Sequence, residues 1–245
     1  MADKRLAVVT GAARGIGRAI VLELLEQGHD VAGLDLNEDQ LSELENVVND
    51  KGYSLITKCV DITDTELLTS TLKELGKENG GVDILVNNAG ITRDKLMMQM
   101  EEDDYDILMN VNLRAAFMAT KTVLRSMIRN KFGRIINISS VAGVMGQAGS
   151  TNYAASKAGL IGMSKSIVRE AGKKGVTANC VAPGFIQTEM TDVLPQAVKD
   201  AALGAIPMKK LGKPEDVAKT VGFLAGEDAG YITGQVVCVD GGMAM

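Results

Sequence analysis

The residues best placed to do chemistry in this sequence are Tyr153 and Lys157, which stand four positions apart. On a helix this spacing puts both side chains on one face, with their Cβ atoms roughly 5 to 6 Å apart. A neighbouring cation stabilises the phenolate of a tyrosine, whose free pKa is about 10. We therefore expect Tyr153 to donate a proton and Lys157 to lower its pKa. The pair alone is a weak motif, because tyrosine and lysine also neighbour each other on solvated helix faces.

Ser140 stands thirteen residues before Tyr153, directly after a β-rich run over residues 134–139. Its hydroxyl could lie beside the carbonyl of a substrate. A serine at this position could also do no more than cap the following helix. The sequence leaves both interpretations open.

A glycine-rich segment follows the first β-rich run and precedes a helical pattern over residues 16–27. Glycines let the backbone approach a phosphate closely, and the amides and dipole of a helix N-terminus attract its charge. The Gly-x3-Gly-x-Gly spacing departs from the commoner Gly-x-Gly-x-x-Gly. The segment predicts a binding site for a dinucleotide pyrophosphate, formed by Gly11, Arg14, Gly15, Ile16 and Gly17.

Asp35 stands eighteen residues beyond Gly17, at the end of the second predicted strand. A carboxylate there can bind the adenosine ribose of NADH, but it would repel the 2′-phosphate of NADPH. Arg14 favours the opposite choice, because a guanidinium can pair with that phosphate. Weighing the two, we expect NADH to be favoured over NADPH.

The fourth predicted strand, over residues 84–87, ends in amide and small residues. Ligands of open α/β sheets bind beyond the carboxyl ends of the strands. We therefore expect Asn88, Ala89 and Gly90 to contact the cofactor.

Short β-rich runs alternate with helical patterns along the whole chain, which is typical of a parallel sheet covered by helices on both faces. We predict a single doubly wound, Rossmann-type α/β domain over residues 1–245 with a seven-stranded parallel sheet. The predicted strands are 6–10, 30–34, 54–59, 84–87, 134–139, 176–182 and 235–239, and the main predicted helices are 16–27, 38–48, 66–75, 105–128 and 154–168.

Three stretches of this pattern bear on function. The helices over 105–128 and 154–168 are apolar or small nearly all round, so each is expected to be buried on two sides. A second subunit would cover the outer side and make the protein a homo-oligomer, although a lid of the same chain could do so instead. The long connection over 184–213 is predicted to be a substrate lid, with a tolerated surface insertion as the alternative.

Composition excludes several classes of function. Hydrophobic residues make up 46% of the chain, the net charge is −5, and there is no tryptophan, so nucleic acid is a poor partner. Three cysteines without a Cys-x-x-Cys pair, and a single histidine, argue against a metal site and fit a reducing compartment. The apolar run over residues 6–9 is too short to cross a membrane, and we expect the protein in the cytoplasm.

The motifs occur in the order found in the short-chain dehydrogenase/reductase family, which the whole chain resembles. They are Thr10-Gly-x3-Gly15-x-Gly17, Asn87-Asn-Ala-Gly90, Ser140, Tyr153-x3-Lys157 and Pro183-Gly184. Three segments are most similar to members that reduce 3-oxoacyl groups on acyl carrier protein in bacterial fatty acid synthesis. They are Asn87-Asn-Ala-Gly-Ile-Thr-Arg-Asp94, Tyr231-Ile-Thr-Gly-Gln235 and Gly241-Gly-Met243.

The resemblance implies roles for individual residues. Tyr153 would be the general acid, Lys157 would lower its pKa and hold the nicotinamide ribose, and Ser140 would orient the carbonyl. Asn112 would complete a catalytic tetrad, with Asn110 as the neighbouring alternative. Further cofactor contacts would come from Asp61 and Ile62 at the adenine and from Pro183, Gly184, Ile186 and Thr188 at the nicotinamide.

The resemblance also implies a homotetramer and an acyl thioester substrate carried on acyl carrier protein or coenzyme A. Basic residues beside the cleft would dock the carrier, and the matching positions are Lys131 and Lys174, flanked by Arg129 and Lys173. A solvated basic face explains those four residues equally well. Steroids, polyols and small ketones are the rival substrates, and a non-catalytic nucleotide-binding regulator is the rival function.

Overall fold

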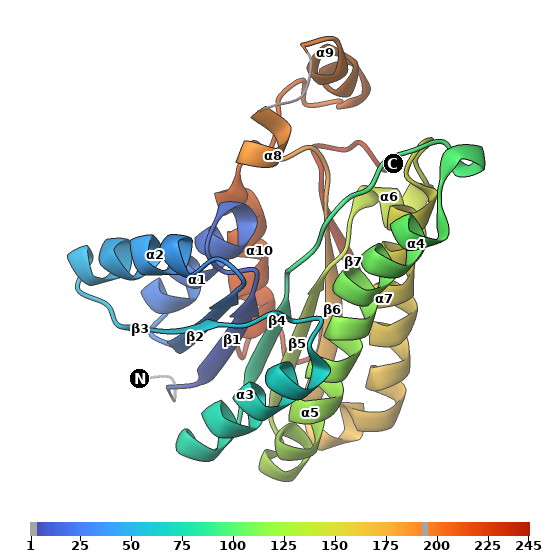
Figure 1. Cartoon of the computed structure of the whole chain (residues 1–245). Coiled ribbons are helices and arrows are strands. Elements are labelled where there is room, and N and C mark those ends of the chain that lie inside the picture. The colour runs from blue at the N-terminus through green and yellow to red at the C-terminus, as the bar shows by residue number, and fades with distance from the viewer. Residues whose placement is uncertain (1–3, 193–195) are drawn as a thin grey trace.

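The computed structural model describes residues 4–192 and 196–245, which contain one parallel sheet of seven strands (Figure 1). Their spatial order is β3-β2-β1-β4-β5-β6-β7, and every neighbouring pair is parallel. The strands are β1 (Leu6–Thr10), β2 (Asp30–Asp35), β3 (Leu55–Cys59), β4 (Ile84–Asn87), β5 (Gly133–Ile138), β6 (Val176–Pro183) and β7 (Val236–Val239). The predicted Rossmann-type sheet is confirmed.

Helices cover both faces of the sheet because successive strand side chains point to opposite sides. In β1, Ala7 and Val9 join one apolar cluster, and Leu6 and Val8 join the other. The first cluster is completed by α1 (Gly15–Glu26), α2 (Glu38–Asp50) and α10 (Pro214–Ala225), and the second by α3 (Thr65–Glu78), α5 (Ala115–Asn130) and α7 (Thr151–Ala171). Within the described ranges, no helix has the length and apolar character needed to cross a membrane.

The predicted helix over 105–128 is interrupted in the structure. The chain forms α4 (Glu102–Met109), a π-helical turn called η2 (Asn110–Arg114), and then α5. Both amide atoms of Asn112 bond to the backbone of Ile91, which anchors the inserted turn beside the end of β4. Apolar periodicity cannot reveal one widened turn, and such turns often occur at functional sites.

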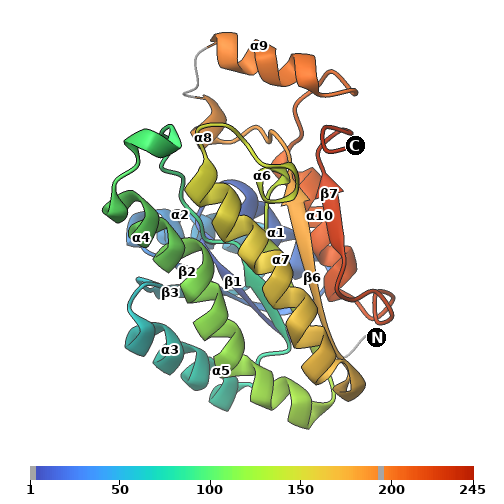
Figure 2. The same ribbon diagram turned by 90° about the vertical axis from the view of Figure 1, so that its right-hand side faces the viewer.

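Short elements gather beyond the carboxyl edge of the sheet. They are η1 (Met97–Gln99), α6 (Val141–Met145), α8 (Glu189–Asp192) and α9 (Gln196–Ala205), while η3 (Gly172–Lys174) lies after α7. The connection predicted over 184–213 thus contains two helices, although its residues 193–195 lie outside the described part of the chain. Figure 1 and Figure 2 show α9 standing beyond α8, away from the helical layers.

Candidate active site

The start of α1 offers unoccupied backbone donors to a ligand. Its N-cap residue, Arg14, makes no side-chain capping hydrogen bond, and the first turn holds no acidic residue. In contrast, Asn37 caps α2 and Asp64 caps α3 through their side chains. The first amides of α1 are therefore available to an anion such as a pyrophosphate.

The glycines before α1 are required by the shape of this loop. Gly11 and Gly15 have φ angles of 62° and 52°, a region that favours glycine. A Cβ atom on Gly17 would overlap the carbonyl oxygen of Gly11. Ile16 is partly buried against the core beneath the loop. The predicted phosphate-binding residues therefore lie together in a tight cradle that fits a dinucleotide.

Asn88 holds this cradle in place. Its Nδ2 donates to the carbonyl oxygens of Thr10 and Gly11, at 3.0 and 2.9 Å. The amides of Asn88 and Ala89 both donate to the hydroxyl of Thr10. The side chain of Asn88 thus ties the end of β4 to the glycine loop.

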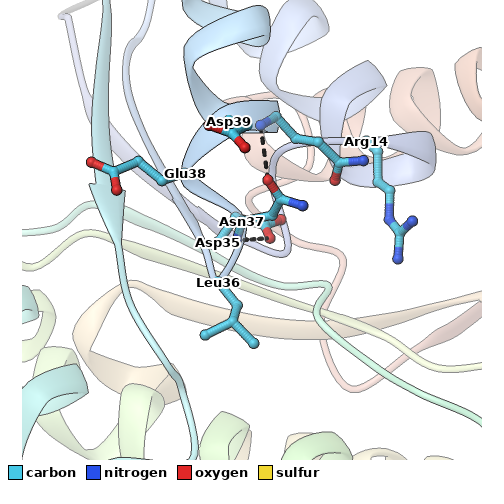
Figure 3. A pocket seen from close by; sticks show the side chains of 7 residues that line it. Arg14, Asp35, Leu36, Asn37, Glu38 and Asp39 are labelled. Atoms are coloured by element: carbon cyan, nitrogen blue, oxygen red, sulfur yellow. Dashed lines mark hydrogen bonds between the residues drawn. The ribbon is translucent and has the colours of Figure 1, made fainter.

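A surface pocket lies next to the loop, lined by Arg14 and by residues 35–40 (Figure 3). The carboxylate of Asp35 accepts the amide of Ala13 at 3.0 Å and that of Asn37 at 3.1 Å. It therefore closes the turn after β2 and fixes the glycine loop. Figure 3 shows Arg14 on one side of the pocket and Glu38 on the other.

The residues expected at the adenine follow β3. Asp61 is exposed, and its Oδ1 accepts both the amide and the hydroxyl of Thr63, at 2.8 and 2.7 Å. Ile62 is half-buried and packs against the second apolar cluster. Asp61 therefore shapes its own turn in this structure, and the two residues extend the cofactor side of the sheet edge.

Lys157 is buried beneath the carboxyl ends of β4 and β5, and its Nζ donates to the carbonyl oxygen of Ile138 at 2.8 Å. A Cβ atom on Gly90 would lie 3.2 Å from Lys157 Nζ and 3.3 Å from Asn112 Oδ1. Lys157 Nζ and Asn112 Oδ1 therefore both lie beside Gly90. The role of Asn112, with Asn110 as the alternative, stays a prediction.

Burial governs the ionisation of the two predicted catalytic groups. It lowers the pKa of Lys157 to about 8. It also raises the pKa of Tyr153, an effect that a hydrogen bond with Ser140 opposes and the charge of Asp94 reinforces. The net shift in the Tyr153 pKa is upward, opposite to the lowering expected from Lys157, because desolvation of the phenolate is the largest effect. The phenol therefore stays protonated near neutral pH, as a proton donor must.

Both interpretations of Ser140 have support. Its Oγ caps α6 by accepting the amide of Ala142 at 3.1 Å. The same side chain hydrogen-bonds with Tyr153 and so opposes the rise in the pKa of that phenol which burial causes. One hydroxyl therefore fixes the short helix and neighbours the proton donor.

The residues after β6 divide into two groups. A Cβ atom on Gly184 would press against Asp240, and the amide of Gly184 bonds to Val239, so the end of β6, including Pro183, packs against β7. The side chain of Ile186 is buried in the first apolar cluster. Thr188, in contrast, reaches the glycine loop, where its methyl group would be 3.5 Å from a Cβ on Gly15.

The basic residues proposed to dock a carrier do not lie beside this cleft. Lys131 caps the end of α5, and Lys174 ends η3, immediately before β5 and β6 begin. Tyr153 is in the first turn of α7, a helix of 21 residues that spans about 30 Å. Figure 2 shows α7 running from the edge near α6 and α8 to the opposite end of the molecule. Within one chain these lysines, with Arg129 and Lys173, therefore lie at the edge of the sheet opposite to Tyr153.

The sequence patterns missed a polar clamp beside the proton donor. Asn152 Nδ2 donates to the backbone oxygens of Arg93 and Asp104, at 3.2 and 3.1 Å. Asp104 in turn pairs with Lys95 at 2.6 Å and with Arg93 at 3.3 Å. The clamp joins the first turn of α7 to the segment after β4. No periodicity or spacing rule reports such contacts between distant segments.

Together, the fold and the glycine loop are those of a nucleotide-binding oxidoreductase. Comparison with known proteins agrees. A family model described as "Enoyl-(Acyl carrier protein) reductase" matches residues 11–244. The chain belongs to the short-chain dehydrogenase/reductase family.

Individual relatives cover almost the whole chain. It is 47% identical over 243 residues to the 3-oxoacyl-[acyl-carrier-protein] reductase FabG of Vibrio harveyi, covering 99% of this chain and 98% of that protein. Identity to the protein of the same name from Escherichia coli K12 is 44% over 243 residues, with the same two coverages. A crystal structure described as a putative gluconate dehydrogenase from Agrobacterium tumefaciens superposes with a TM-score of 0.95 at 30% identity, covering 98% of this chain and 96% of that one.

The expected preference for NADH over NADPH is wrong. The FabG reductases of Vibrio harveyi and Escherichia coli, which match at 47% and 44% identity, depend on NADPH. The structure supplies the physical reason for the error, because Asp35 accepts two backbone amides and has a structural role that the ribose interpretation overlooked. Arg14 lines the same pocket as a candidate partner of the 2′-phosphate.

The glycine cradle makes a direct prediction. Replacing Gly17 by alanine forces the loop apart, because the new Cβ overlaps the Gly11 carbonyl oxygen. We expect nucleotide affinity, measured by calorimetry, to fall at least about tenfold, a cost of about 1.4 kcal/mol. Gly162→Ala is the control, since nothing lies within 4 Å of the added atom. Unchanged affinity in Gly17→Ala would contradict the assignment of the cradle.

Proposed function

We propose that this protein reduces the β-ketone of a 3-oxoacyl thioester, carried on acyl carrier protein or coenzyme A, to the 3-hydroxyacyl product in fatty acid biosynthesis. The observation that carries the proposal is the convergence of Tyr153, Ser140, Lys157 and Asn112 at the sheet edge beside the glycine cradle. The names of relatives 44–47% identical over nearly the full chain support the same substrate.

The proposed chemistry assigns one role to each side chain. A nicotinamide bound beside the glycine cradle would supply the hydride. Tyr153 donates its phenolic proton to the oxygen that becomes the alcohol, and Ser140 hydrogen-bonds that oxygen. The Lys157 ammonium stabilises the resulting phenolate. Asn112 bonds to the backbone of Ile91 and so fixes the segment after β4 beside Lys157.

We propose NADPH as the cofactor. Its pyrophosphate would lie on the amides of α1, and Arg14 would bind the 2′-phosphate at the pocket beside Asp35. Thr188 would close over the glycine loop from the connection after β6, which we propose to be a substrate lid.

Polyol or sugar-acid oxidation is the second candidate, because the structural neighbour is described as a putative gluconate dehydrogenase. Its identity is 30%, well below the 44–47% of the acyl-carrier reductases, so the thioester remains the better supported substrate. A non-catalytic regulator is disfavoured because Ser140, Tyr153 and Lys157 are all intact.

We further propose that the protein assembles as a homotetramer. In Figure 2, α4 and α5 follow each other and α7 lies beside them, and no other described element covers this face. Their outer surfaces expose Tyr105, Ile107 and Phe117, the last with 52% of its surface accessible. A second copy would cover this apolar surface, as the two small-residue helices suggested.

The central test of the proposed function is the variant Tyr153→Phe. We expect it to keep its fold and nucleotide affinity but to lose at least about 10²-fold in kcat with acetoacetyl thioesters, the usual contribution of a positioned general acid. Wild-type protein should prefer those thioesters to gluconate, polyols and steroids when turnover is measured by the absorbance of the reduced cofactor. Near-normal turnover of the variant, or a preference for gluconate, would refute the proposal.

The buried lysine predicts a pH dependence. Because burial lowers the pKa of Lys157 to about 8, its positive charge is complete below that pH and disappears above it. Reduction should therefore slow as pH rises through about 8, well before an ordinary lysine would titrate. Lys157→Gln should have a lower rate at every pH, and that rate should not fall as pH rises through about 8. A wild-type rate that stays constant to pH 9.5 would contradict the assignment.

The tetramer proposal is tested by light scattering at micromolar concentration. Wild-type protein should have the mass of four chains. Phe117→Glu places a charge in the apolar surface, so it should give smaller species with the same helical content. Glu43→Gln, a change at an exposed position of α2 on the other face of the sheet, serves as the control. A monomeric wild type would refute the proposal.

A further inference from the structure

Arg14 of the glycine loop is paired with a residue 175 positions away. Its Nη1 lies 3.2 Å from Oε2 of Glu189, the first residue of α8. Both side chains are exposed, with 62% and 70% of their surfaces accessible. The ion pair therefore lies where an arriving ligand can compete for the guanidinium.

The pocket beside Arg14 is otherwise acidic. Of the described residues that line it, Arg14 alone carries a positive charge, whereas Asp35, Glu38 and Asp39 are carboxylates. Figure 3 shows these groups around one hollow. An anionic group entering the pocket therefore depends on Arg14, and Glu189 already holds that cation.

The start of α8 is fixed against the loop, so the pair is more than a chance contact of two long side chains. The methyl group of Thr188 packs toward Gly15. Thr191 accepts the amide of Thr188 at 2.9 Å and donates to the carbonyl oxygen of Ile186 at 2.8 Å. These bonds hold Glu189 within reach of Arg14.

We propose that Glu189 is a specificity-determining residue that competes with the 2′-phosphate of NADPH for Arg14, and so reduces the preference for the phosphorylated nucleotide. This inference rests on the proposed cofactor. The carboxylate acts in two ways, because it occupies the guanidinium and adds negative charge near the phosphate. NADH has no phosphate at this position, so its binding is unaffected.

The binding experiment uses the purified full chain, calorimetry, and NADP⁺ and NAD⁺ as probes. Exposed ion pairs are weak, so Glu189→Gln should tighten NADP⁺ binding by about 3- to 10-fold. The dissociation constant for NAD⁺ should change less than about twofold. Glu170→Gln, at an exposed position remote from the pocket, should change neither constant.

A double-variant cycle separates competition for Arg14 from other effects. In an Arg14→Ala background, Glu189→Gln should lose most of its effect on NADP⁺. Weaker NADP⁺ binding by Glu189→Gln would mean that the carboxylate aligns Arg14 for the phosphate, and it would overturn the proposal. An unchanged ratio of the two constants would also overturn it.

The same measurement distinguishes this inference from the proposed reaction. Calorimetry needs no thioester, so a chain that shows the predicted shift but reduces no 3-oxoacyl substrate would refute the proposed reaction alone. A wild-type chain that binds no NADP⁺ would refute the proposed cofactor and this inference together.

Discussion

The burial of the Lys157 ammonium is the constraint on which the rest of the site depends. A buried charge is costly unless polar groups surround it. Lys157 is 3% exposed and bonds to the carbonyl oxygen of Ile138. Such a group stays in place only if the surrounding backbone is fixed. Its pKa is lowered because the buried environment stabilises the ammonium less well than water does.

Each neighbouring element contributes to that fixed environment. The hydroxyl of Ser139, at the end of β5, donates to the backbone oxygen of Lys157. Gly90, after β4, leaves room for Nζ, and the π-helical turn brings Asn112 to the same point. The β1-β4 neighbourhood in the sheet places the glycine cradle next to this group. The strand order therefore places the glycine cradle beside Lys157.

Local patterns in the sequence predicted much of this arrangement. The four-residue spacing of Tyr153 and Lys157, and the glycines before α1, depend only on neighbouring backbone, so they could be recognised directly. Contacts between distant segments could not. Asp35 was misread because the backbone amides that it accepts cannot be recognised in the sequence. The π-helical turn at Asn112 leaves no periodic signal. Lys131 stands just before β5, and its place at the edge of the sheet opposite to Tyr153 follows from the direction of that strand. The pairing of Arg14 with Glu189 likewise required the fold.

The most direct test of the central claim is an NMR titration of Lys157 in protein labelled with ¹³C at lysine Cε, assigned by comparison with Lys157→Gln. Burial predicts a midpoint of about 8 for this residue, against an ordinary value of 10.5. The signal should also be distinct from those of the exposed lysines. A midpoint near 10.5 would show that water reaches the ammonium, and it would contradict the account of the site given above.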